Sequence, residues 1–279
     1  MDGCARRIAG LAAFPRKPAD DHMTKSPFQR SLNLAGSMLA TLARAGQGIA
    51  THPAVERPPL LFELYEFEAC PYCRLVRETL TELDLDALIY PCPKGGQRFR
   101  SKAVEIGGRA QFPLLVDPNR DEWLYESADI IAYLYRNYGH RPLPLRLTVM
   151  PLQKFGSSLV GLSRHGAGLR ARPSRDIAQP LELYSFESSP FARLVRERLC
   201  ELELPYVLRS VGRSRASDWV PPAVRDAAAV VAEPSTPNRR ALFDRAGRIS
   251  IPYLVDPNTG TELAESADIL DYLESTYAE

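Results

Sequence analysis

Apolar and polar residues change their period several times between residues 61 and 140, and each change predicts a new element. Residues 61–67 are rich in β-forming residues with some alternation, which predicts a strand. After Pro71, the apolar residues Val76, Leu80 and Leu83 recur at the spacing of one helical face. The segment "ALIYPCP" then has the composition of a second strand. A strand, a helix and a second strand therefore open this region.

The second half of the region predicts a short helix, a hairpin and a final helix. The short helix lies near residues 101–106 and ends at "GG". The segments "PLLVD" and "EWLY" surround the turn sequence "DPNRD", which is typical of a hairpin, and residues 127–138 predict a helix closed by Gly139. The order β-α-β-α-β-β-α indicates an α/β domain with a mixed sheet.

This pattern occurs twice, because the chain contains an internal repeat. "FELYEFEACPYCRLVRETLTELDL" matches "LELYSFESSPFARLVRERLCELEL", which places Ser189 opposite Cys70. "FPLLVDPNRDEWLYESADIIAYL" matches "IPYLVDPNTGTELAESADILDYL", which places Pro252 opposite Pro113. The offset grows from 119 to 139 residues, so the second copy carries 20 additional residues. Upstream, "LATLARAGQG" and "LVGLSRHGAG" also align, and we expect a short helix, ended by a glycine, to pack on each copy.

Composition and charge describe a globular chain of about two domains. Of the 279 residues 45% are hydrophobic and 25% charged, and the net charge of +1 gives no general reason to bind nucleic acid. No stretch approaches the roughly 20 apolar residues that span a bilayer. The five cysteines do not resemble a secreted disulfide framework, so we expect a cytoplasmic protein. An organellar leader in residues 1–22 is the alternative, as is a true start at Met23.

The pair in "CPYC" stands where the first strand gives way to a helix. Unpaired N–H groups at a helix N-terminus favour a thiolate and lower its pKa from about 8.5 into the range of roughly 3.5–7.5. Cys70 would lie at or before the first turn, Pro71 needs no N–H there, and Cys73 shares the same face. A redox dithiol, half of a metal site and two core cysteines are the three interpretations. Because His22, His52, His140 and His165 show no ligand-like spacing, we expect no metal.

Three motifs occur in order: "CPYC" after a strand, "FP" before another strand, and "ESADI" at the start of a helix. Together they resemble the thioredoxin fold in its glutaredoxin and glutathione-transferase N-terminal-domain versions. The resemblance covers roughly residues 60–140 and 180–279. It implies two tandem thioredoxin-like βαβαββα domains, each preceded by a short helix. The implied division is a poorly defined segment at 1–29, a helix and connector at 30–60, domain 1 with CPYC at 61–145, a helix and connector at 146–180, and domain 2 without cysteines at the motif at 181–279.

The resemblance also implies a glutathione site in the first copy. Cys70 would attack and Cys73 would resolve, which makes them the two halves of a redox-active disulfide. The residues that would bind glutathione are Tyr72, Phe112, the cis-proline Pro113, Glu126 and Ser127. Ser127 would receive a carboxylate at a helix N-terminus, and the alternative is that it only caps its helix. A second site in the other copy would comprise Ser188, Ser189, Ile251, Pro252, Glu265 and Ser266.

Three departures from the family pattern shape these expectations. Glutaredoxins often carry a lysine before CPYC, whereas this chain has Glu66 and Glu68, whose charges would oppose a thiolate, and Arg74 and Arg77 would compensate. The second copy has no thiols at its motif, so it would either bind glutathione through a serine or serve packing. No all-helical transferase domain follows the second copy, which disfavours conjugation. In the basic loop, one of Lys94, Arg98, Arg100 and Lys102 would bind the glycyl carboxylate of glutathione, and the alternative is a loop whose charges are only solvated. Cys92 would be structural.

The function we expect is glutathione-dependent thiol–disulfide exchange of the glutaredoxin type, through the CPYC of the first copy. Glutathione would be the co-substrate, and proteins with a disulfide or a glutathionylated thiol would be the partners. Two alternatives stay open: a non-catalytic glutathione-binding or interaction protein, and an enzyme of the glutathione-transferase type that uses Ser189 or Cys70. A metal cluster shared between two molecules, with glutathione completing the ligands, is a further alternative.

Overall fold

The computed structural model describes residues 34–38, 47–144, 166–215, 218 and 234–279. Residues 34–38 are helical and belong to the helix expected before the first copy. The rest of that helix, the whole helix expected before the second copy, and most of the 20 additional residues lie outside the described residues.

The first copy has the predicted order of elements. They are β1 (Phe62–Glu66), α2 (Pro71–Leu83), β2 (Ala87–Pro91), α3 (Arg100–Gly107), β3 (Leu114–Asp117), β4 (Glu122–Tyr125) and α4 (Ser127–Leu134). β1 pairs with β2 in parallel and with β3 antiparallel, and β3 and β4 form the hairpin. The mixed βαβαββα domain is confirmed.

The end of the last helix differs from the prediction. α4 passes into a π-helix, η1 (Tyr135–Gly139), and the left-handed residue that caps it is His140, with φ 46°, not Gly139. A side chain at position 139 would place its Cβ 3.3 Å from the Leu83 side chain. Position 139 packs closely against α2, which favours a residue without a side chain. The prediction that Gly139 caps the helix was therefore wrong.

The second copy repeats these elements. They are β5 (Leu181–Ser185), α7 (Pro190–Glu201), β6 (Tyr206–Ser210), α9 (Pro237–Ala246), β7 (Tyr253–Asp256), β8 (Thr261–Leu263) and α10 (Ser266–Tyr277). β5 pairs with β6 in parallel and with β7 antiparallel, as in the first copy.

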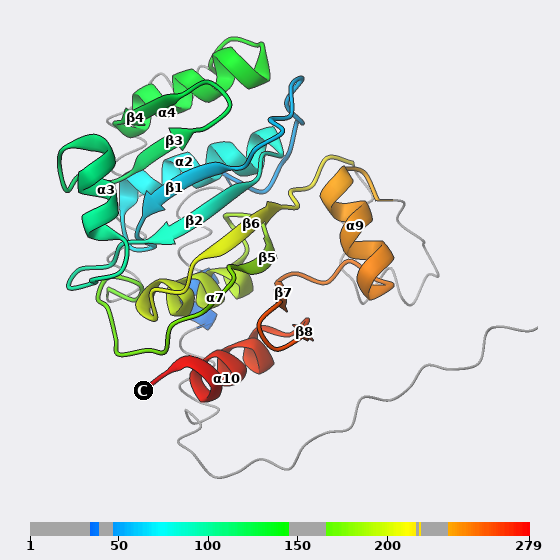
Figure 1. Cartoon of the computed structure of the whole chain (residues 1–279). Coiled ribbons are helices and arrows are strands. Elements are labelled where there is room, and N and C mark those ends of the chain that lie inside the picture. Colours follow the sequence, from blue (N-terminus) through cyan, green and yellow to red (C-terminus); the bar gives the residue numbers. More distant parts are fainter. Residues whose placement is uncertain (1–33, 39–46, 145–165, 216–217, 219–233) are drawn as a thin grey trace, which may run out of the picture.

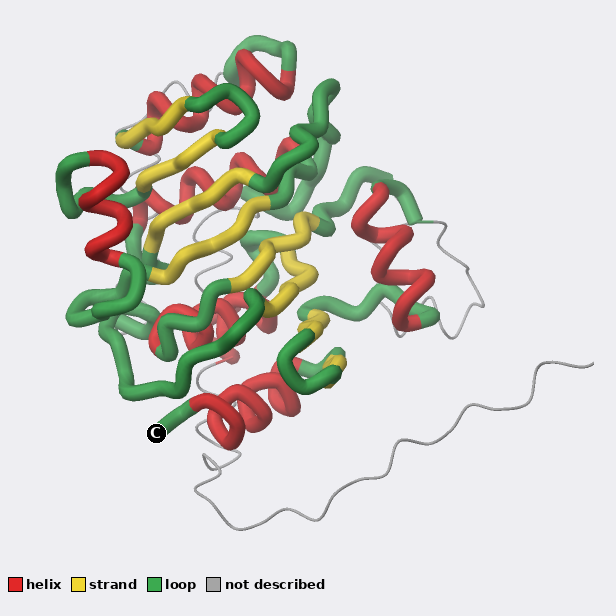
Figure 2. Tube along the Cα trace, viewed as in Figure 1, coloured by secondary structure: helices red, strands yellow, loops and turns green. Residues whose placement is uncertain are grey.

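The two copies share one eight-stranded sheet in the order β4-β3-β1-β2-β6-β5-β7-β8 (Figures 1 and 2). The joint is an antiparallel pairing of β2 with β6, in which Leu88 lies opposite Val207 and Ile89 opposite Tyr206. An unpaired edge strand exposes free N–H and C=O groups, and each copy covers that edge of the other. The copies therefore form an internal pseudo-dimer.

Helices cover both faces of the shared sheet. Successive strand residues point to opposite faces, and Leu64 joins one hydrophobic cluster while Tyr65 joins another. The large cluster on the Leu64 face also contains residues of α2, α4, α7 and α10. On the other face α3 contributes Ala103 to one small cluster and α9 contributes Leu242 to another. None of the helices in the described part of the chain is long and apolar enough to cross a membrane.

Each connector crosses to the other copy. The N–H of Thr51, ahead of the first copy, donates to the carbonyl of Arg213 at 2.8 Å. The N–H of Lys94, in the first copy, donates to the carbonyl of Leu169, ahead of the second copy, at 2.7 Å. These reciprocal crossings tie the two copies together on both sides of the β2–β6 joint.

The "VDPN" turn of each copy anchors the final helical segment to the sheet. Asp117 accepts hydrogen bonds from the hydroxyls of Tyr133, at 2.7 Å, and Tyr138. In the second copy Asp256 accepts from the hydroxyls of Tyr272, at 2.6 Å, and Tyr277. The same acid-and-two-tyrosines arrangement therefore stabilises both domains.

Candidate functional site

Cys70 is the N-cap residue of α2, as the motif predicted. Its backbone is extended, and its Sγ accepts a hydrogen bond from the N–H of Cys73 at 3.4 Å. Pro71 occupies the first helical position, where the absent N–H costs nothing. Both cysteines are reduced and buried, with exposed fractions of 3% for Cys70 and 0% for Cys73. The dithiol therefore lies at the start of a helix, beneath the surface.

The two thiols of this pair differ in acidity. A hydrogen bond from the Cys73 side chain is the main cause that lowers the pKa of Cys70; two backbone N–H groups and the charge of Arg77 add to it, and burial opposes it. Burial raises the pKa of Cys73 well above its ordinary value, and the hydrogen bond to Cys70 raises it further. The thiol of Cys70 is therefore the more acidic of the two.

The two predicted cis-prolines are present. The peptide bonds Phe112–Pro113 and Ile251–Pro252 are both cis. The Phe112 ring is half-buried and lies edge-on to the ring of Phe67, with centroids 6.2 Å apart. The guanidinium of Arg100 lies over the Phe112 ring, 4.8 Å from its centroid. Tyr72 projects from the start of α2 and is 42% exposed.

Glu126 and Ser127 lie at the start of α4. Glu126 has a left-handed φ of 63°, makes no capping bond and accepts from the side-chain amide of Gln111. Ser127 is the first helical residue and is buried, and its hydroxyl has no hydrogen-bond partner among the described residues. A serine that caps a helix bonds a backbone N–H from the position before the helix. Ser127 therefore does not cap α4, and its hydroxyl remains for another partner.

Of the four basic residues in the loop, only Arg100 lies against Phe112. Arg98 points to the second copy, where it donates to the carbonyl of Leu202 at 3.0 Å and pairs with Asp176 at 3.3 Å. Lys94 and Lys102 are exposed. Arg100 is therefore the candidate among these four residues for a contact with the glycyl carboxylate of glutathione.

The second copy contains the counterpart of Arg100, in a different environment. Arg100 donates to the carbonyls of Cys92 and Pro93, and Arg239 donates to those of Val211 and Gly212, the equivalent positions. Arg239 also pairs with Asp218 at 2.8 Å. Arg100 has no carboxylate partner among the described residues. Of these two equivalent arginines, Arg239 is neutralised by a carboxylate, whereas Arg100 is not neutralised by any described residue.

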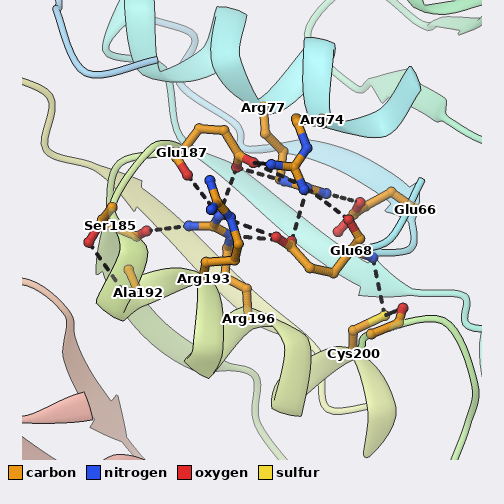
Figure 3. Close-up of polar contacts among 12 residues, drawn as sticks. Glu66, Glu68, Arg74, Arg77, Ser185, Glu187, Ala192, Arg193, Arg196 and Cys200 are labelled. Atoms are coloured by element: carbon orange, nitrogen blue, oxygen red, sulfur yellow. Dashed lines mark hydrogen bonds and ion pairs between the residues drawn. The ribbon is translucent and has the colours of Figure 1, made fainter. Parts of the chain in front are cut away.

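A buried cluster of arginines and glutamates joins the two copies (Figure 3), and its residue Glu68 lies two positions before Cys70 in the chain. We call Glu68, Arg77, Glu187 and Arg196 the Arg–Glu cluster. The guanidinium of Arg77 contacts Glu187 at 2.9 Å and Glu68 at 3.0 Å. That of Arg196 contacts Glu187 at 3.1 Å and Glu68 at 3.2 Å. Each arginine thus binds one glutamate of its own copy and one of the other.

The sequence analysis missed this cluster, although a signal for it is present. Glu68 and Glu187, and likewise Arg77 and Arg196, stand 119 residues apart at equivalent places of the two copies. The charges were retained in both motifs where the thiols were not. Such a repeat indicates side chains that meet across an internal symmetry axis.

The glutamates expected to oppose a thiolate at Cys70 are engaged elsewhere. Glu66 is paired with Arg77, and Glu68 with both arginines of the cluster. Burial raises the pKa of Glu66 to about 8 in spite of Arg77, so the carboxyl is mostly protonated at neutral pH. The compensation by Arg77 is therefore present, and Arg196 of the second copy takes part in it.

Ser188 and Ser189 of the predicted second site bond to groups of the chain itself. Ser188 donates its hydroxyl to the carbonyl of Gln47, and its N–H donates to the carbonyl of Gly48 at 3.3 Å. Ser189 is the N-cap of α7 and accepts from the N–H of Ala192 at 3.2 Å. The hydroxyl of Ser37 donates to the carbonyl of Pro190 at 2.7 Å. Glu265 is exposed and Ser266 half-buried at the start of α10, as the repeat requires.

Cys92 and Cys200 lie in the interior. Both are buried, and burial raises the pKa of each thiol. Cys200 accepts from the N–H of Glu68 at 3.4 Å and donates to the carbonyl of Gly168 at 3.3 Å. In the described part of the chain no three His, Cys, Asp or Glu side chains are grouped so that they could hold a metal ion.

Comparison with known proteins agrees with this arrangement. The family model of the glutathione S-transferase N-terminal domain matches residues 64–142 and, a second time, residues 183–279. No curated protein and no solved structure matches the chain. The two matches cover both halves of the pseudo-dimer.

Proposed function

The chain belongs to the glutathione S-transferase N-terminal domain family in both of its copies, and on this premise we propose that it is a glutathione-dependent thiol–disulfide oxidoreductase that acts through Cys70. The observation that carries the proposal is the N-cap position of Cys70, where the helix and the Cys73 side chain lower the pKa of its thiol. A reducing compartment such as the cytosol belongs to the proposal, because the reaction begins with Cys70 in its reduced form.

The first chemical step is attack on a mixed disulfide between a protein and glutathione. The Cys70 thiolate attacks the glutathione sulfur, a Cys70–glutathione disulfide forms, and the protein leaves as a thiolate that takes up a proton. The lowered pKa of Cys70 supplies the thiolate near neutral pH.

The second step returns Cys70 to the thiolate. A free glutathione thiolate attacks the glutathione sulfur of the adduct, so that oxidised glutathione leaves and Cys70 is released as the thiolate. The incoming glutathione is the thiol that is oxidised, and the protein thiol released in the first step is the sulfur that is reduced. Attack by Cys73 would instead give a Cys70–Cys73 disulfide and release glutathione. The raised pKa and complete burial of Cys73 slow that route, so we assign resolution mainly to glutathione.

Glutathione binding in the proposal uses the groups gathered around Cys70. The backbone at Phe112, beside cis-Pro113, pairs with the cysteinyl portion, and Tyr72 covers one side. The γ-glutamyl carboxylate binds at the start of α4, where the Ser127 hydroxyl is unpaired among the described residues and Glu126 takes the amino group. Arg100 takes the glycyl carboxylate, because it lies over Phe112 and has no described carboxylate partner.

The second copy has a structural part in the proposal. Its motif carries no thiol, Ser188 is bonded to the connector, and Asp218 neutralises the arginine that corresponds to Arg100. A transferase reaction through Ser189 has little support, because the adjacent Ser188 is bonded to the connector and the arginine that corresponds to Arg100 is paired with Asp218.

A non-catalytic glutathione-binding protein is the second candidate. The observation that favours it is the burial of Cys70, of which 3% is exposed. Binding through Ser127 and Phe112 does not require an accessible sulfur. In that case calorimetry would find glutathione binding that the Cys70→Ser substitution leaves unchanged, and no turnover.

The test of the proposed function is turnover of a glutathionylated peptide by glutathione. We expect wild type and Cys73→Ser to turn over, because Cys73 is not needed for resolution by glutathione, and Cys70→Ser to lose activity. Cys92→Ser is the matched control, since Cys92 is a buried cysteine outside the site. Equal activity of wild type and Cys70→Ser would refute the proposal, and so would inactivity of a folded wild-type protein.

A further inference from the structure

The Arg–Glu cluster is retained in both copies, whereas the redox chemistry is not. Cys70 corresponds to Ser189 and Cys73 to Ala192, but Glu68, Arg74 and Arg77 correspond to Glu187, Arg193 and Arg196. Every one of these arginines and glutamates is at least 97% buried. Buried charges are costly unless paired, so this arrangement needs both copies to be present.

The contacts of the cluster are reciprocal. Arg196 reaches from α7 to Glu68, with Nε 3.2 Å from Oε2 and Nη2 3.2 Å from Oε1. Arg77 reaches from α2 to Glu187, with Nε 2.9 Å from Oε2. Two carboxylates thus share two guanidiniums, and neither copy can neutralise its glutamate as fully alone.

Cys70 lies next to this cluster. Glu68 precedes it by two residues, and the carbonyl of Phe67, between Glu66 and Glu68, accepts from the N–H of Cys70 at 3.0 Å. Arg77, whose charge acts on the Cys70 thiol, links Cys70 to the cluster, because it contacts Glu66, Glu68 and Glu187. The further charged groups packed around the cluster are Arg74 of α2 and, from the second copy, Arg193 and Arg196.

The balance of these charges depends on the second copy. Without Arg196, the charges of Glu68 and Glu187 would be left to Arg77 and to Arg74, which lies 3.8 Å from Glu187, and the surroundings of Cys70 would become more negative. Without the charge of Glu187, the guanidiniums of Arg77 and Arg196 would be left to Glu68, and the surroundings would become more positive. In a buried, low-dielectric region such a change acts strongly on a neighbouring thiolate.

We infer that Arg196 and Glu187 of the thiol-free copy are positioning residues for Cys70, which set the charge around its sulfur through Glu68 and Arg77. The second copy is then part of the redox centre and not only a packing partner. This inference concerns the same thiol as the proposed function. It does not depend on glutathione, because the reactivity of Cys70 can be measured without it.

The experiment is alkylation of the full chain with iodoacetamide as a function of pH, with modification at Cys70 followed by mass spectrometry of its peptide. The midpoint of the rate profile gives the pKa of Cys70. We expect Arg196→Gln to raise this midpoint by about one unit and Glu187→Gln to lower it by about one unit. The double variant Arg196→Gln/Glu187→Gln should return close to the wild-type midpoint.

Opposite signs separate an electrostatic role from a structural one, since loosening of the interface would move all variants in the same direction. Arg209→Gln is the matched control: Arg209 also crosses between the copies, to Asp86 at 3.2 Å, but lies outside the cluster, and its loss should leave the midpoint unchanged. If circular dichroism shows that Arg196→Gln is not folded, the inference is tested by the midpoint of Glu187→Gln alone. This substitution keeps the shape of the side chain.

An unchanged midpoint in folded Glu187→Gln would overturn the inference, and so would shifts of equal sign in both single variants. A shift in Arg209→Gln as large as that in the cluster variants would also overturn it. The midpoint can be measured even in a protein that turns over no glutathionylated peptide. Failure of the proposed function and failure of this inference are therefore distinguishable.

Discussion

The N–H of Cys73 points to the sulfur of Cys70, with nitrogen and sulfur 3.4 Å apart. This contact places the two cysteines of the motif in unequal roles. Hydrogen bonding from the Cys73 side chain lowers the pKa of Cys70, and burial raises that of Cys73. The two thiols of the motif therefore differ in acidity.

Replacing the donor should change the acidity of the nucleophile. Cys73→Ala removes the side-chain hydrogen bond that is the largest cause lowering the pKa of Cys70, so this pKa should rise by about one unit. Cys73→Ser keeps a hydrogen-bond donor, so the pKa of Cys70 should rise less in this variant than in Cys73→Ala. The alkylation rate of Cys70 as a function of pH measures both. Identical profiles for the alanine and serine variants would show that the side-chain donor has no effect.

Ser127 should contribute to ligand binding and not to stability. Its hydroxyl has no partner among the described residues, so Ser127→Ala should leave the melting temperature nearly unchanged. The loss of a hydrogen bond to a carboxylate should weaken glutathione binding about tenfold, as measured by calorimetry. Ser266→Ala, the equivalent change in the second copy, is the control and should have no effect on affinity. A large drop in melting temperature with unchanged affinity would instead assign Ser127 to the helix.

Arg77 should be among the most important residues for stability. It is fully buried and contacts Glu66, Glu68 and Glu187. Arg77→Met leaves buried carboxylates without their partner, which should cost about 3–5 kcal/mol in the free energy of unfolding. Urea denaturation measures this cost. Arg209→Gln breaks a partly exposed ion pair and should cost at most about 1 kcal/mol, so similar costs for both variants would contradict the role assigned to the cluster.

Asp117 should stabilise the fold only in its charged form. Burial alone would raise its pKa, but hydrogen bonds from Tyr138 and Tyr133 lower it below the ordinary value of 3.8. An acid with a lowered folded pKa contributes stability above its unfolded pKa and loses it as the pH falls through the folded pKa. The free energy of unfolding of wild type should therefore exceed that of Asp117→Asn by about 1–3 kcal/mol at pH 6. This difference should shrink below a pH of about 4.

Urea denaturation of both proteins between pH 6 and acidic pH measures this difference. Asp256→Asn, in the equivalent turn of the second copy, should behave in the same way, because Tyr277 and Tyr272 lower the pKa of Asp256. A difference between wild type and variant that is constant with pH would exclude a contribution from the carboxylate charge.

The features that could be predicted from the sequence are those carried by local pattern or by the repeat. The N-cap position of Cys70 follows from a strand, a Cys-Pro pair and helical spacing within residues 61–83. The cis bonds at Pro113 and Pro252, and the equivalence of Ser189 with Cys70, follow from the family resemblance and the alignment of the two copies.

The features that could not be predicted depend on contacts between distant parts of the chain. The sequence pattern of a strand does not reveal which other strand will pair with its edge. The pairing of β2 with β6 could therefore not be predicted. Glu66 and Glu68 were expected to oppose Cys70 because only neighbouring residues were weighed. Glu68 is neutralised in part by Arg196, which is 128 residues away along the chain.

The central claim is that Cys70 performs glutathione exchange, and intact-protein mass spectrometry tests it most directly. The Cys73→Ser variant is incubated with oxidised glutathione, and the modified residue is located by fragmentation. We predict one glutathione on Cys70, removed again by reduced glutathione. A native protein in which Cys70 stays unmodified, while the same cysteine reacts in a denatured sample, would contradict the account.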